Sequence, residues 1–277
     1  MTPQSNNNAW RFLDTGTARG AENMAIDEAL LVHCRETGRP VIRFYGWDPP
    51  TLSLGFFQKA TREVDPDRCR EEGIDLVRRP TGGRAVLHDR ELTYSVIIPE
   101  DHPLMPRTVT ESYRRISMAL LAGFHKLGIP ATLSGETTIR TADFRSAACF
   151  EAPSSYEVVV DGKKIVGSAQ VRRDGMILQH GAIMIDWDVD QLFRVLITKD
   201  RDSAQRMKVF LRQKATTIRE VTGQTPDYDT LSQAFFGGFR DELAPGLQAD
   251  RLSRDEQTTA RRLCRDKYDH SDWTFRK

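Results

Sequence analysis

The segment 78–88, RRPTGGRAVLH, places two adjacent glycines between arginines. Gly82 and Gly83 carry no Cβ, so the backbone can approach a ligand closely, and free N–H groups in such a turn suit an anion or a carbonyl oxygen. Arginine side chains beside the turn would strengthen an anionic site. The same pattern also fits an ordinary hairpin turn with solvated charges, because a Gly-Gly pair alone is a weak signal. The segment is therefore a candidate binding turn with both interpretations open.

Cys149 differs from the other three cysteines in its surroundings. No C-x-x-C pair and no neighbouring histidine at metal-ligand spacing accompanies Cys34, Cys69, Cys149 or Cys264, so a disulfide framework and a structural zinc site are poor fits. Cys149 lies among small residues within 134–153, whose weak periodicity predicts a loop, and reactive groups concentrate in loops on a rigid scaffold. A nucleophilic thiolate there would need a nearby cation or base. The alternative is a structural thiol, which is the commoner role of a free cysteine.

Lysine is scarce, since only nine of the 40 cationic residues are lysines. Between residues 127 and 198 the only lysines are the adjacent pair Lys163 and Lys164, in a predicted strand. Neighbours on a strand point to opposite faces, so one can face water while the other faces the interior. Lys164 precedes the small residues of IVGSA, which could line a narrow tunnel, and its ammonium could pair with a thiolate or a carbonyl oxygen. An exposed lysine beside a tight turn is the alternative.

Two histidines complete the set of candidate residues. His88 and His180 each lie at the edge of a predicted strand, and together with Cys149 they would formally allow a Cys–His enzyme. A structural histidine is the commoner outcome, and the order of these residues fits no protease signature.

Short strands and amphipathic helices must position these residues. Helices are predicted over 19–35, with an apolar stripe that includes Met24 and Cys34, and over 109–127, with Gly128 as the stop. Runs rich in β-forming residues, separated by Gly, Pro and Asp, predict strands at 41–47, 51–57, 74–79, 84–88 and 92–98. Residues 156–185 predict three strands joined by the turns Asp161-Gly162 and Asp174-Gly175, and the chain is helical after Val189. Strands with helices packed on them indicate an α+β domain.

Composition narrows the class of protein. The chain has 277 residues, 39% of them hydrophobic, which is enough to bury a core and excludes disorder. Lys and Arg (40) balance Asp and Glu (39), which argues against a nucleic-acid coat or a polybasic membrane binder. The opening MTPQSNNNAW does not resemble a secretory signal, and no segment is long and apolar enough to cross a membrane. We expect a cytoplasmic protein with free thiols and with no nucleic-acid or membrane partner.

Three separate segments, in this order, resemble the biotin/lipoate protein ligase superfamily and, within it, the cysteine-dependent octanoyltransferases. They are RRPTGGRAVLHDRELTYS (78–95), the loop cysteine Cys149 and GKKIVGSAQVRRDGMILQHGAI (162–183). The resemblance begins in GAENMAIDEALL (20–31), continues through FYGWDPPTLSLGFFQ (44–58) to about residue 220, and touches Tyr268 and Trp273. It implies an α+β catalytic domain over residues 1–225, with a mixed, largely antiparallel sheet flanked by helices. Residues 226–277 would form a helical C-terminal extension packed on that domain.

The resemblance also implies an acyl transfer in two steps. The cysteine of such an enzyme takes octanoate from acyl carrier protein as a thioester, and a lysine of the glycine cleavage H protein, a lipoyl domain, receives it as an amide. Carried over, Cys149 would be the nucleophile and Lys164 the partner that lowers its pKa. The residues implied to line the acyl and carbonyl pocket are Arg79, Gly82, Gly83, His88, Ser168, Ala169, His180 and Gly181. Exchange between thioesters is nearly isoenergetic, so the acid need not be activated with ATP. No metal or cofactor is implied, and we expect a monomer.

Relatives within the superfamily share parts of this pattern. ATP-dependent lipoate ligases have the same glycine-rich strand and lysine, but no catalytic cysteine, and they usually have a third glycine where this chain has Arg84. Amidotransferases that move octanoyl from H protein to other lipoyl domains also use a loop cysteine, so Cys149 does not exclude them. The residues of segments 78–88 and 46–55 are more similar to those of the enzymes that transfer octanoyl from acyl carrier protein. A non-catalytic acyl- or biotinyl-binding protein is a further alternative, against which the retention of both Cys149 and Lys164 counts.

Overall fold

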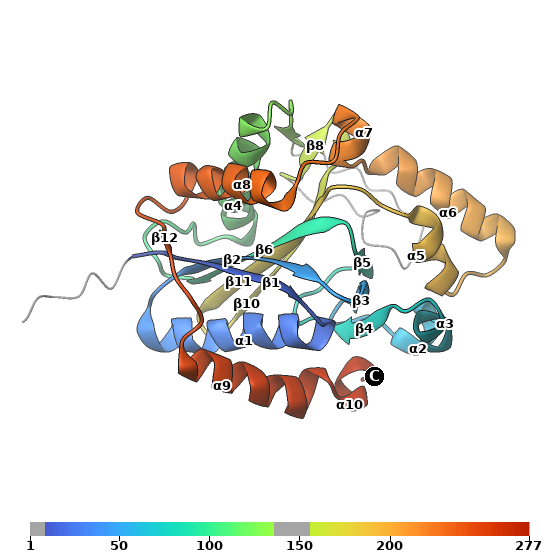
Figure 1. Cartoon of the computed structure of the whole chain (residues 1–277), viewed down its shortest axis with the longest axis horizontal. Helices are drawn as coiled ribbons and strands as arrows, with labels where there is room; N and C mark the ends of the chain where they lie inside the picture. Colours follow the sequence, from blue (N-terminus) through green and yellow to red (C-terminus); the bar gives the residue numbers. More distant parts are fainter. Residues whose placement is uncertain (1–8, 136–155, 277) are drawn as a thin grey trace, which may run out of the picture.

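The computed structural model describes residues 9–135 and 156–276, and its centre is a six-stranded mixed sheet (Figure 1). The strands across the sheet, in order, are β10 (Val166–Arg173), β11 (Met176–Met184), β6 (Glu91–Pro99), β2 (Val41–Trp47), β1 (Arg11–Ala18) and β12 (Gln248–Ala249). β10, β11, β6 and β2 pair antiparallel, whereas β1 pairs parallel with both β2 and β12. The prediction of an α+β fold with a mixed, largely antiparallel sheet is therefore confirmed.

Two small sheets pack beside the large one. The first contains β4 (Asp75–Arg78), β3 (Thr51–Leu54) and β5 (Val86–His88), and the second contains β7 (Thr132–Leu133), β8 (Val158–Val160) and β9 (Lys163–Lys164). The chain leaves the second small sheet at Ile165 and enters the large one as β10, so the predicted strand around Lys164 is shared between two sheets. Both predicted turns in this region adopt positive φ at their Asp and Gly residues, as two-residue hairpin turns require.

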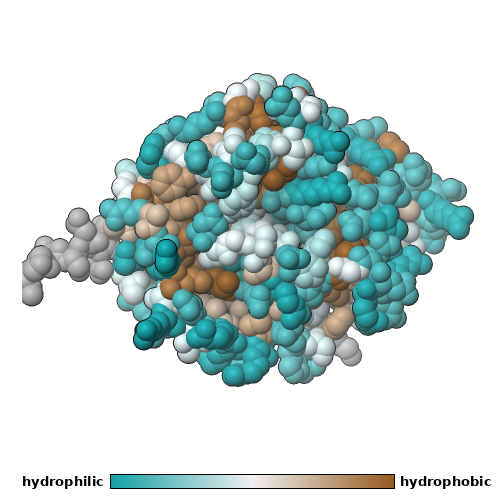
Figure 2. Space-filling model, viewed as in Figure 1, coloured by the Kyte–Doolittle hydropathy of each residue, from teal (hydrophilic) through white to brown (hydrophobic). Residues whose placement is uncertain are grey.

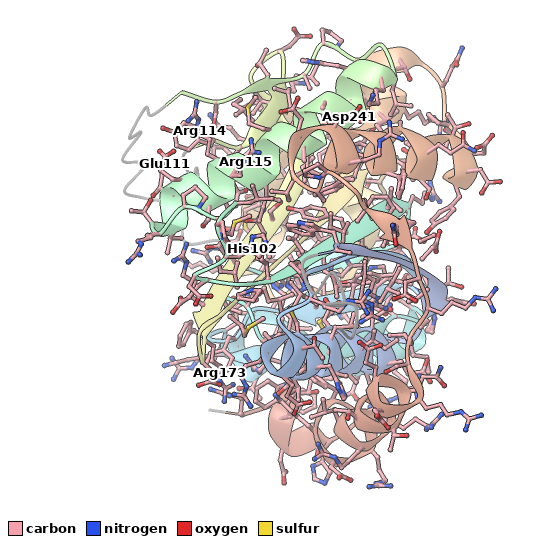
Figure 3. The ribbon with its side chains drawn as sticks, turned by 90° about the vertical axis from the view of Figure 1, so that its left-hand side faces the viewer. His102, Glu111, Arg114, Arg115, Arg173 and Asp241 are labelled. Atoms are coloured by element: carbon pink, nitrogen blue, oxygen red, sulfur yellow. The ribbon has the colours of Figure 1, made fainter. Side chains whose placement is uncertain are left out.

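Helices cover both faces of the large sheet. α1 (Gly20–Thr37) and α9 (Arg254–Leu263) lie on one side, and α4 (Val109–Lys126) and α8 (Tyr228–Glu242) lie together on the other, as Figures 1 and 3 show. The predicted helices over 19–35 and 109–127 are thus confirmed. The remaining helical segments are α2 (Ala60–Glu63), α3 (Pro66–Glu71), α5 (Val189–Val195), α6 (Arg201–Lys214), α7 (Ile218–Thr222), a π-helical turn (Cys264–Tyr268) and α10 (Ser271–Thr274).

Apolar side chains on the two sheet faces explain this layering. Phe44 and Tyr94 alternate with polar neighbours along β2 and β6, and their rings lie 5.9 and 5.7 Å from the ring of Phe239 on α8. Since successive residues on a strand point to opposite faces, the polar neighbours must face α1. The outer surface in Figure 2 is mostly hydrophilic, with apolar residues in small scattered patches. Among the helices of residues 9–135 and 156–276, none has the length and hydropathy to cross a membrane.

The C-terminal residues are tied to the strands by buried charges. The Arg11 guanidinium donates to both carboxylate oxygens of Glu256, at 2.5 and 3.0 Å, and to Asp250 at 2.7 Å. Arg78, fully buried at the end of β4, donates to the main-chain carbonyls of Trp273 and Thr274. The last helices therefore complete the packing around α1 and β4.

Replacing Glu256 with Gln should test this attachment. Glu256 is 2% exposed and its partner Arg11 is 8% exposed, so removal of one charge leaves the other buried without a full partner. We expect the free energy of unfolding, measured with urea, to fall by about 3 kcal/mol. Asp269→Asn is the matched control, because its pair with Arg19 joins the same regions at 3.3 Å but is half exposed, and it should cost under about 1 kcal/mol. Equal losses in the two variants would contradict a dominant role for the buried pair.

Candidate active site

A narrow pocket, with a cavity volume of about 20 Å³, lies where the large sheet meets the sheet formed by β3, β4 and β5. Several of the predicted site residues line it: Arg79, His88, Ser168, Ala169, His180 and Gly181. The other lining residues are Met24, Tyr45, Trp47, Ser53, Val86, Thr93, Gly167 and Ala182. Gly82, Gly83 and Lys164 lie outside this lining, and Cys149 lies outside the described residues. The structure thus brings two distant sequence segments, around residues 79–88 and 168–181, to one site.

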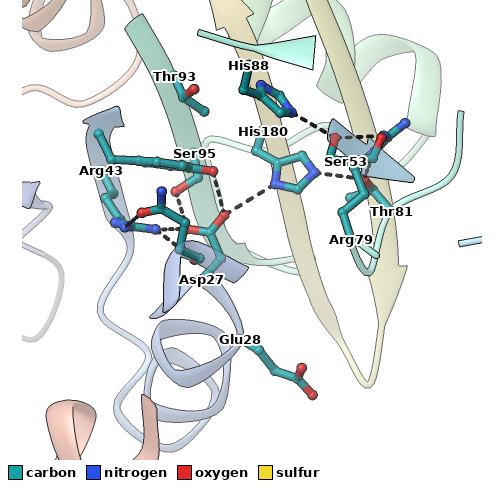
Figure 4. A network of polar contacts seen from close by, with 12 residues as sticks. Asp27, Glu28, Arg43, Ser53, Arg79, Thr81, His88, Thr93, Ser95 and His180 are labelled. Carbon is teal, nitrogen blue, oxygen red and sulfur yellow. Dashed lines mark hydrogen bonds and ion pairs between the residues drawn. The ribbon is translucent and has the colours of Figure 1, made fainter. Parts of the chain in front are cut away.

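Sheet register explains how His180 enters the pocket. His180 on β11 is directly opposite Ser95 on β6, which is opposite Arg43 on β2. Residues in such a cross-strand row point to the same face, and this row faces α1. Asp27 of α1 lies over the row and accepts hydrogen bonds from Arg43 at 2.8 Å, Ser95 at 3.0 Å and Tyr45 at 3.1 Å, and it lies 3.2 Å from His180 Nδ1 (Figure 4).

Asp27 and His180 have defined protonation states in this environment. Burial alone would raise the pKa of the Asp27 carboxyl, but the Arg43 guanidinium and the other donors outweigh it, so the pKa lies below its usual value. Burial lowers the pKa of His180, against the opposing effect of Asp27. Asp27 is therefore an ionised acceptor and His180 a neutral imidazole at neutral pH, with its proton on Nδ1, facing the carboxylate.

A second carboxylate–histidine pair lies on the other side of the pocket. Glu91 at the start of β6 accepts from His88 Nδ1 at 2.7 Å and from the Thr93 hydroxyl at 2.5 Å. The indole N–H of Trp47 donates to Thr93 at 2.7 Å, and the Trp47 ring stacks on His88 with centroids 4.1 Å apart. The Oε2 atom of Glu91 is buried and has no hydrogen-bond partner among the described residues. His88 Nε2 lies 2.7 Å from the hydroxyl of Ser53 on β3.

Arg79 connects the two pairs. Its Nε donates to the Thr81 hydroxyl at 3.2 Å, which in turn lies 2.7 Å from His180 Nε2. Its Nη1 donates to both the hydroxyl and the carbonyl of Ser53, each at 3.0 Å. Its Nη2 donates to the carbonyls of Gly82 at 2.8 Å and Arg84 at 2.7 Å. A guanidinium has five N–H donors, and these contacts use all five. Arg79 lines the pocket, but its donors hold the protein rather than a ligand.

The glycine turn lies beside this network. Gly83 has φ +93, which L side chains rarely adopt. Its carbonyl packs against Gly55, where an added Cβ would lie 1.9 Å from the Gly83 oxygen. The N–H groups of Gly82 and Gly83 donate no hydrogen bond to any residue in 9–135 or 156–276. Neither glycine is part of the pocket lining, yet both N–H groups remain available for an anion or a carbonyl oxygen.

Lys164 is buried, as one of the two alternatives for the lysine pair predicts. It is 6% exposed, while Lys163 is more accessible. The Lys164 ammonium donates to Glu157, a residue that is 7% exposed, at 2.5 Å. The bridge between Lys164 and Ala215, which follows α6, fixes the backbone of this strand. The ammonium and the Glu157 carboxylate therefore form a buried ion pair.

The small residues of β10 and β11 are required by close packing. Ser168 is opposite Gly181, and its hydroxyl lies 2.8 Å from the Tyr94 hydroxyl on the neighbouring strand. A Cβ at Gly181 would lie 2.6 Å from the Ser168 Oγ and 2.7 Å from a main-chain oxygen. Ala169 is opposite His180, on the other face. These small residues line one end of the pocket, and the tunnel stays a prediction.

Sequence reasoning missed several residues of this network: Asp27, Ser53, Thr81, Glu91, Thr93 and Glu157. Two signals were available. Asp27 shares the buried stripe of its helix with Met24 and Cys34, which is an unusual place for a carboxylate. Glu91 follows His88 at a spacing of three residues. No pattern in a single sequence indicates that Glu157 would pair with Lys164. Within the described residues, no group of three His, Cys, Asp or Glu side chains gathers as metal ligands.

Comparison with known proteins agrees with this geometry. The family model for the lipoyl protein ligase A/B catalytic domain matches residues 19–240. An octanoyltransferase LipM of Geobacillus kaustophilus (strain HTA426) is 46% identical over 273 residues, which cover 97% of this chain and 98% of the relative. An octanoyltransferase LipM of Bacillus subtilis (strain 168) is 44% identical over 273 residues, with 97% and 98% coverage.

Solved structures share the fold. A bipartite lipoate protein ligase from Thermoplasma acidophilum, from a study of that ligase and its E2 lipoyl domain, superposes with a TM-score of 0.80 at 26% identity, covering 97% of this chain and 96% of the other. A lipoate-protein ligase A bound with ATP gives a TM-score of 0.77 at 27% identity, with 97% and 98% coverage. From the family match and the near full-length identity, the chain belongs to the lipoyl protein ligase A/B catalytic-domain family and, within it, to the LipM octanoyltransferases.

Proposed function

We propose that this protein moves octanoyl from octanoyl-acyl carrier protein, by way of a thioester on Cys149, to a lysine of the glycine cleavage H protein. The observation that carries the proposal is the 46% identity to an octanoyltransferase over 97% of the chain. The lining of the pocket supports it, because mostly apolar walls with a few fixed polar groups suit an acyl chain and its carbonyl.

The first step exchanges one thioester for another. The Cys149 thiolate attacks the carbonyl carbon of the donor thioester, the bond to the carrier sulfur breaks, and the carrier leaves as a thiol after it takes up a proton. Lys164 supplies a buried positive charge on the strand that leads into the pocket wall, which would favour the thiolate. The N–H groups of Gly82 and Gly83, which donate to no described residue, would donate hydrogen bonds to the carbonyl oxygen while negative charge develops on it.

The second step forms the amide. A neutral lysine amine of the acceptor attacks the Cys149 thioester, the thiolate leaves, and the amine loses one proton as the amide forms. His88, Ser168, Ala169, His180 and Gly181 would enclose the acyl chain, while Arg79 holds the glycine turn. This step is downhill, because an amide is more stable than a thioester, so no ATP is needed.

Intact mass measurement tests the proposal. The purified protein is incubated with octanoyl-acyl carrier protein and should gain the mass of one octanoyl group, located at Cys149 by peptide analysis. Addition of H protein should remove that mass and transfer it to a lysine of the acceptor. Absence of any mass gain with this donor, together with a gain from octanoyl-H protein, would instead support the amidotransferase.

An ATP-dependent ligase is the second candidate, favoured by the likeness to a lipoate-protein ligase A bound with ATP. It predicts pyrophosphate release from ATP and free octanoate or lipoate without any carrier protein. The proposal predicts no pyrophosphate release under these conditions.

The setting of the enzyme is also a proposal. We propose that it acts in the cytoplasm, as a monomer and without a cofactor, and that residues 1–225 form the catalytic domain while 226–277 form an extension packed on it. Sedimentation of the purified protein tests the monomer. The two partners, acyl carrier protein and the H protein, follow from the proposed reaction.

A further inference from the structure

Two matching arms of hydrogen bonds converge on Arg79 from opposite sides of the pocket. One arm runs from Asp27 through His180 to Thr81, and the other runs from Glu91 through His88 to Ser53, as Figure 4 shows in part. In each arm the carboxylate contacts Nδ1 of a histidine, and Nε2 of that histidine contacts a hydroxyl. The two hydroxyls are the two to which the Arg79 guanidinium donates.

The direction of each proton follows from Arg79 and the two carboxylates. An arginine has no acceptor, so the hydroxyls of Thr81 and Ser53 must accept from it. Each hydroxyl could also accept a second bond, so the carboxylates decide the order: a carboxylate at Nδ1 can only accept, which places the proton on Nδ1, and Nε2 of the neutral ring then accepts the hydroxyl proton. Each histidine therefore carries its proton on Nδ1 and donates it to a carboxylate. All of these residues are at most 7% exposed, so an alternative orientation would leave buried polar atoms unsatisfied.

This order constrains the chemistry of the pocket. His88 and His180 both use their Nε2 lone pairs on protein hydroxyls, so neither has a free base directed at a substrate. The network instead holds the backbone in place. Arg79 Nη2 donates to the carbonyls of Gly82 and Arg84 and so fixes the turn that contains Gly83. The arms begin on α1 and β6, a helix and a strand that are largely buried in the fold.

We propose that Asp27 and Glu91 are positioning residues that fix the tautomers of His180 and His88 and thereby, through Thr81, Ser53 and Arg79, the glycine turn at which the acyl carbonyl is bound. The link to catalysis rests on the proposed octanoyl transfer, whereas the proton order rests on the hydrogen-bond geometry alone. The arms are unequal, because Asp27 has a buried partner in Arg43, whereas one oxygen of Glu91 has no hydrogen-bond partner among the described residues.

Nitrogen-15 NMR of the histidine rings tests the proton order. At pH 7 the ring shifts of His88 and His180, assigned by His→Gln substitution, should each show a protonated Nδ1 and an unprotonated Nε2. An amide can donate where an ionised carboxylate only accepts, so Asp27→Asn should change the His180 tautomer alone, and Glu91→Gln that of His88 alone. A protonated Nε2 on either ring of the unsubstituted protein would overturn the assignment.

Steady-state kinetics tests the positioning role. Each carboxylate variant should lower kcat for octanoyl transfer by about tenfold to a hundredfold with little change in KM for the donor, since the turn is displaced rather than removed. Glu256→Gln is the matched control: it removes a buried carboxylate outside the pocket and should lower stability while leaving kcat and the histidine shifts unchanged at a temperature where it is folded.

A third variant tests the positioning role even if Asp27→Asn fails to fold. Thr81→Val removes the hydroxyl between Arg79 and His180 and leaves the pair of Asp27 and Arg43 intact, so it should give the same loss of kcat. Unchanged kcat in Glu91→Gln and Thr81→Val would overturn the positioning role. If the unsubstituted protein transfers no octanoyl at all, the proposed function fails, and the NMR result still decides the proton order.

Discussion

Replacement of Cys149 by Ala is expected to abolish octanoyl transfer, with a loss on the order of 10³-fold or more in rate. The proposed route has no other way to hold the acyl group between donor and acceptor, and removal of a covalent nucleophile is among the largest single-residue effects in enzymes. The measurement is transfer of octanoyl from its carrier to H protein, with intact mass of the enzyme followed in parallel. The variant should show neither the mass gain nor the product.

The other three cysteines cannot easily replace Cys149. Burial raises the pKa of Cys34 to about 12 and that of Cys69 to about 11, so both thiols are protonated at neutral pH. Burial and the nearby carboxylates of Asp269 and Glu22 also raise the pKa of Cys264. Cys264→Ala, at a partly accessible site, is therefore the control that should keep both the mass gain and the transfer. Full-rate transfer by the Cys149 variant would reject the thioester mechanism.

The elements of this fold follow from local sequence, whereas the polar network does not. The predicted boundaries of α1, α4 and the strands around 92–98 and 156–185 are close to those observed, because periodicity, Gly stops and Asp-Gly turns act within a few residues. The placement of Arg43, Ser95 and His180 side by side depends instead on the register of β2, β6 and β11. A shift of one residue would turn any of them to the opposite face, and nothing local specifies that register.

In the candidate site, too, local motifs predict some residues, whereas their partners depend on the tertiary structure. The small residues and histidines of the pocket were indicated by their motifs, but the partner of each histidine comes from a different part of the fold. Asp27 reaches His180 across 153 positions of the chain. Arg79 was expected to line the acyl and carbonyl pocket, and it lines the pocket between the two sheets. No sequence argument could assign its donors, because all five are satisfied by main-chain and hydroxyl oxygens of its own surroundings.

Replacement of Lys164 by Arg is expected to slow alkylation of Cys149 by iodoacetamide near neutral pH, by about tenfold, and to lower octanoyl transfer at least as much. A shift of one unit in a thiol pKa changes the thiolate fraction about tenfold when the pH lies below that pKa. Arginine keeps the charge but is larger, planar and unable to take the compact position of an ammonium. The pH profile of alkylation should move to higher pH in the variant.

A control for the Lys164 variants must also account for Glu157, which is the buried partner of Lys164. Loss of the Lys164 charge alone leaves a carboxylate that is 7% exposed without its 2.5 Å partner, so instability could be mistaken for lost catalysis. The double variant Lys164→Gln/Glu157→Gln removes both charges together and should fold, yet alkylate as slowly as Lys164→Arg. Glu157→Gln alone should not slow alkylation, because it leaves the cation that favours the thiolate. If the double variant alkylated at the unsubstituted rate, Lys164 would have no part in thiol activation, and its burial beside Glu157 would serve the packing of β8 and β9 alone.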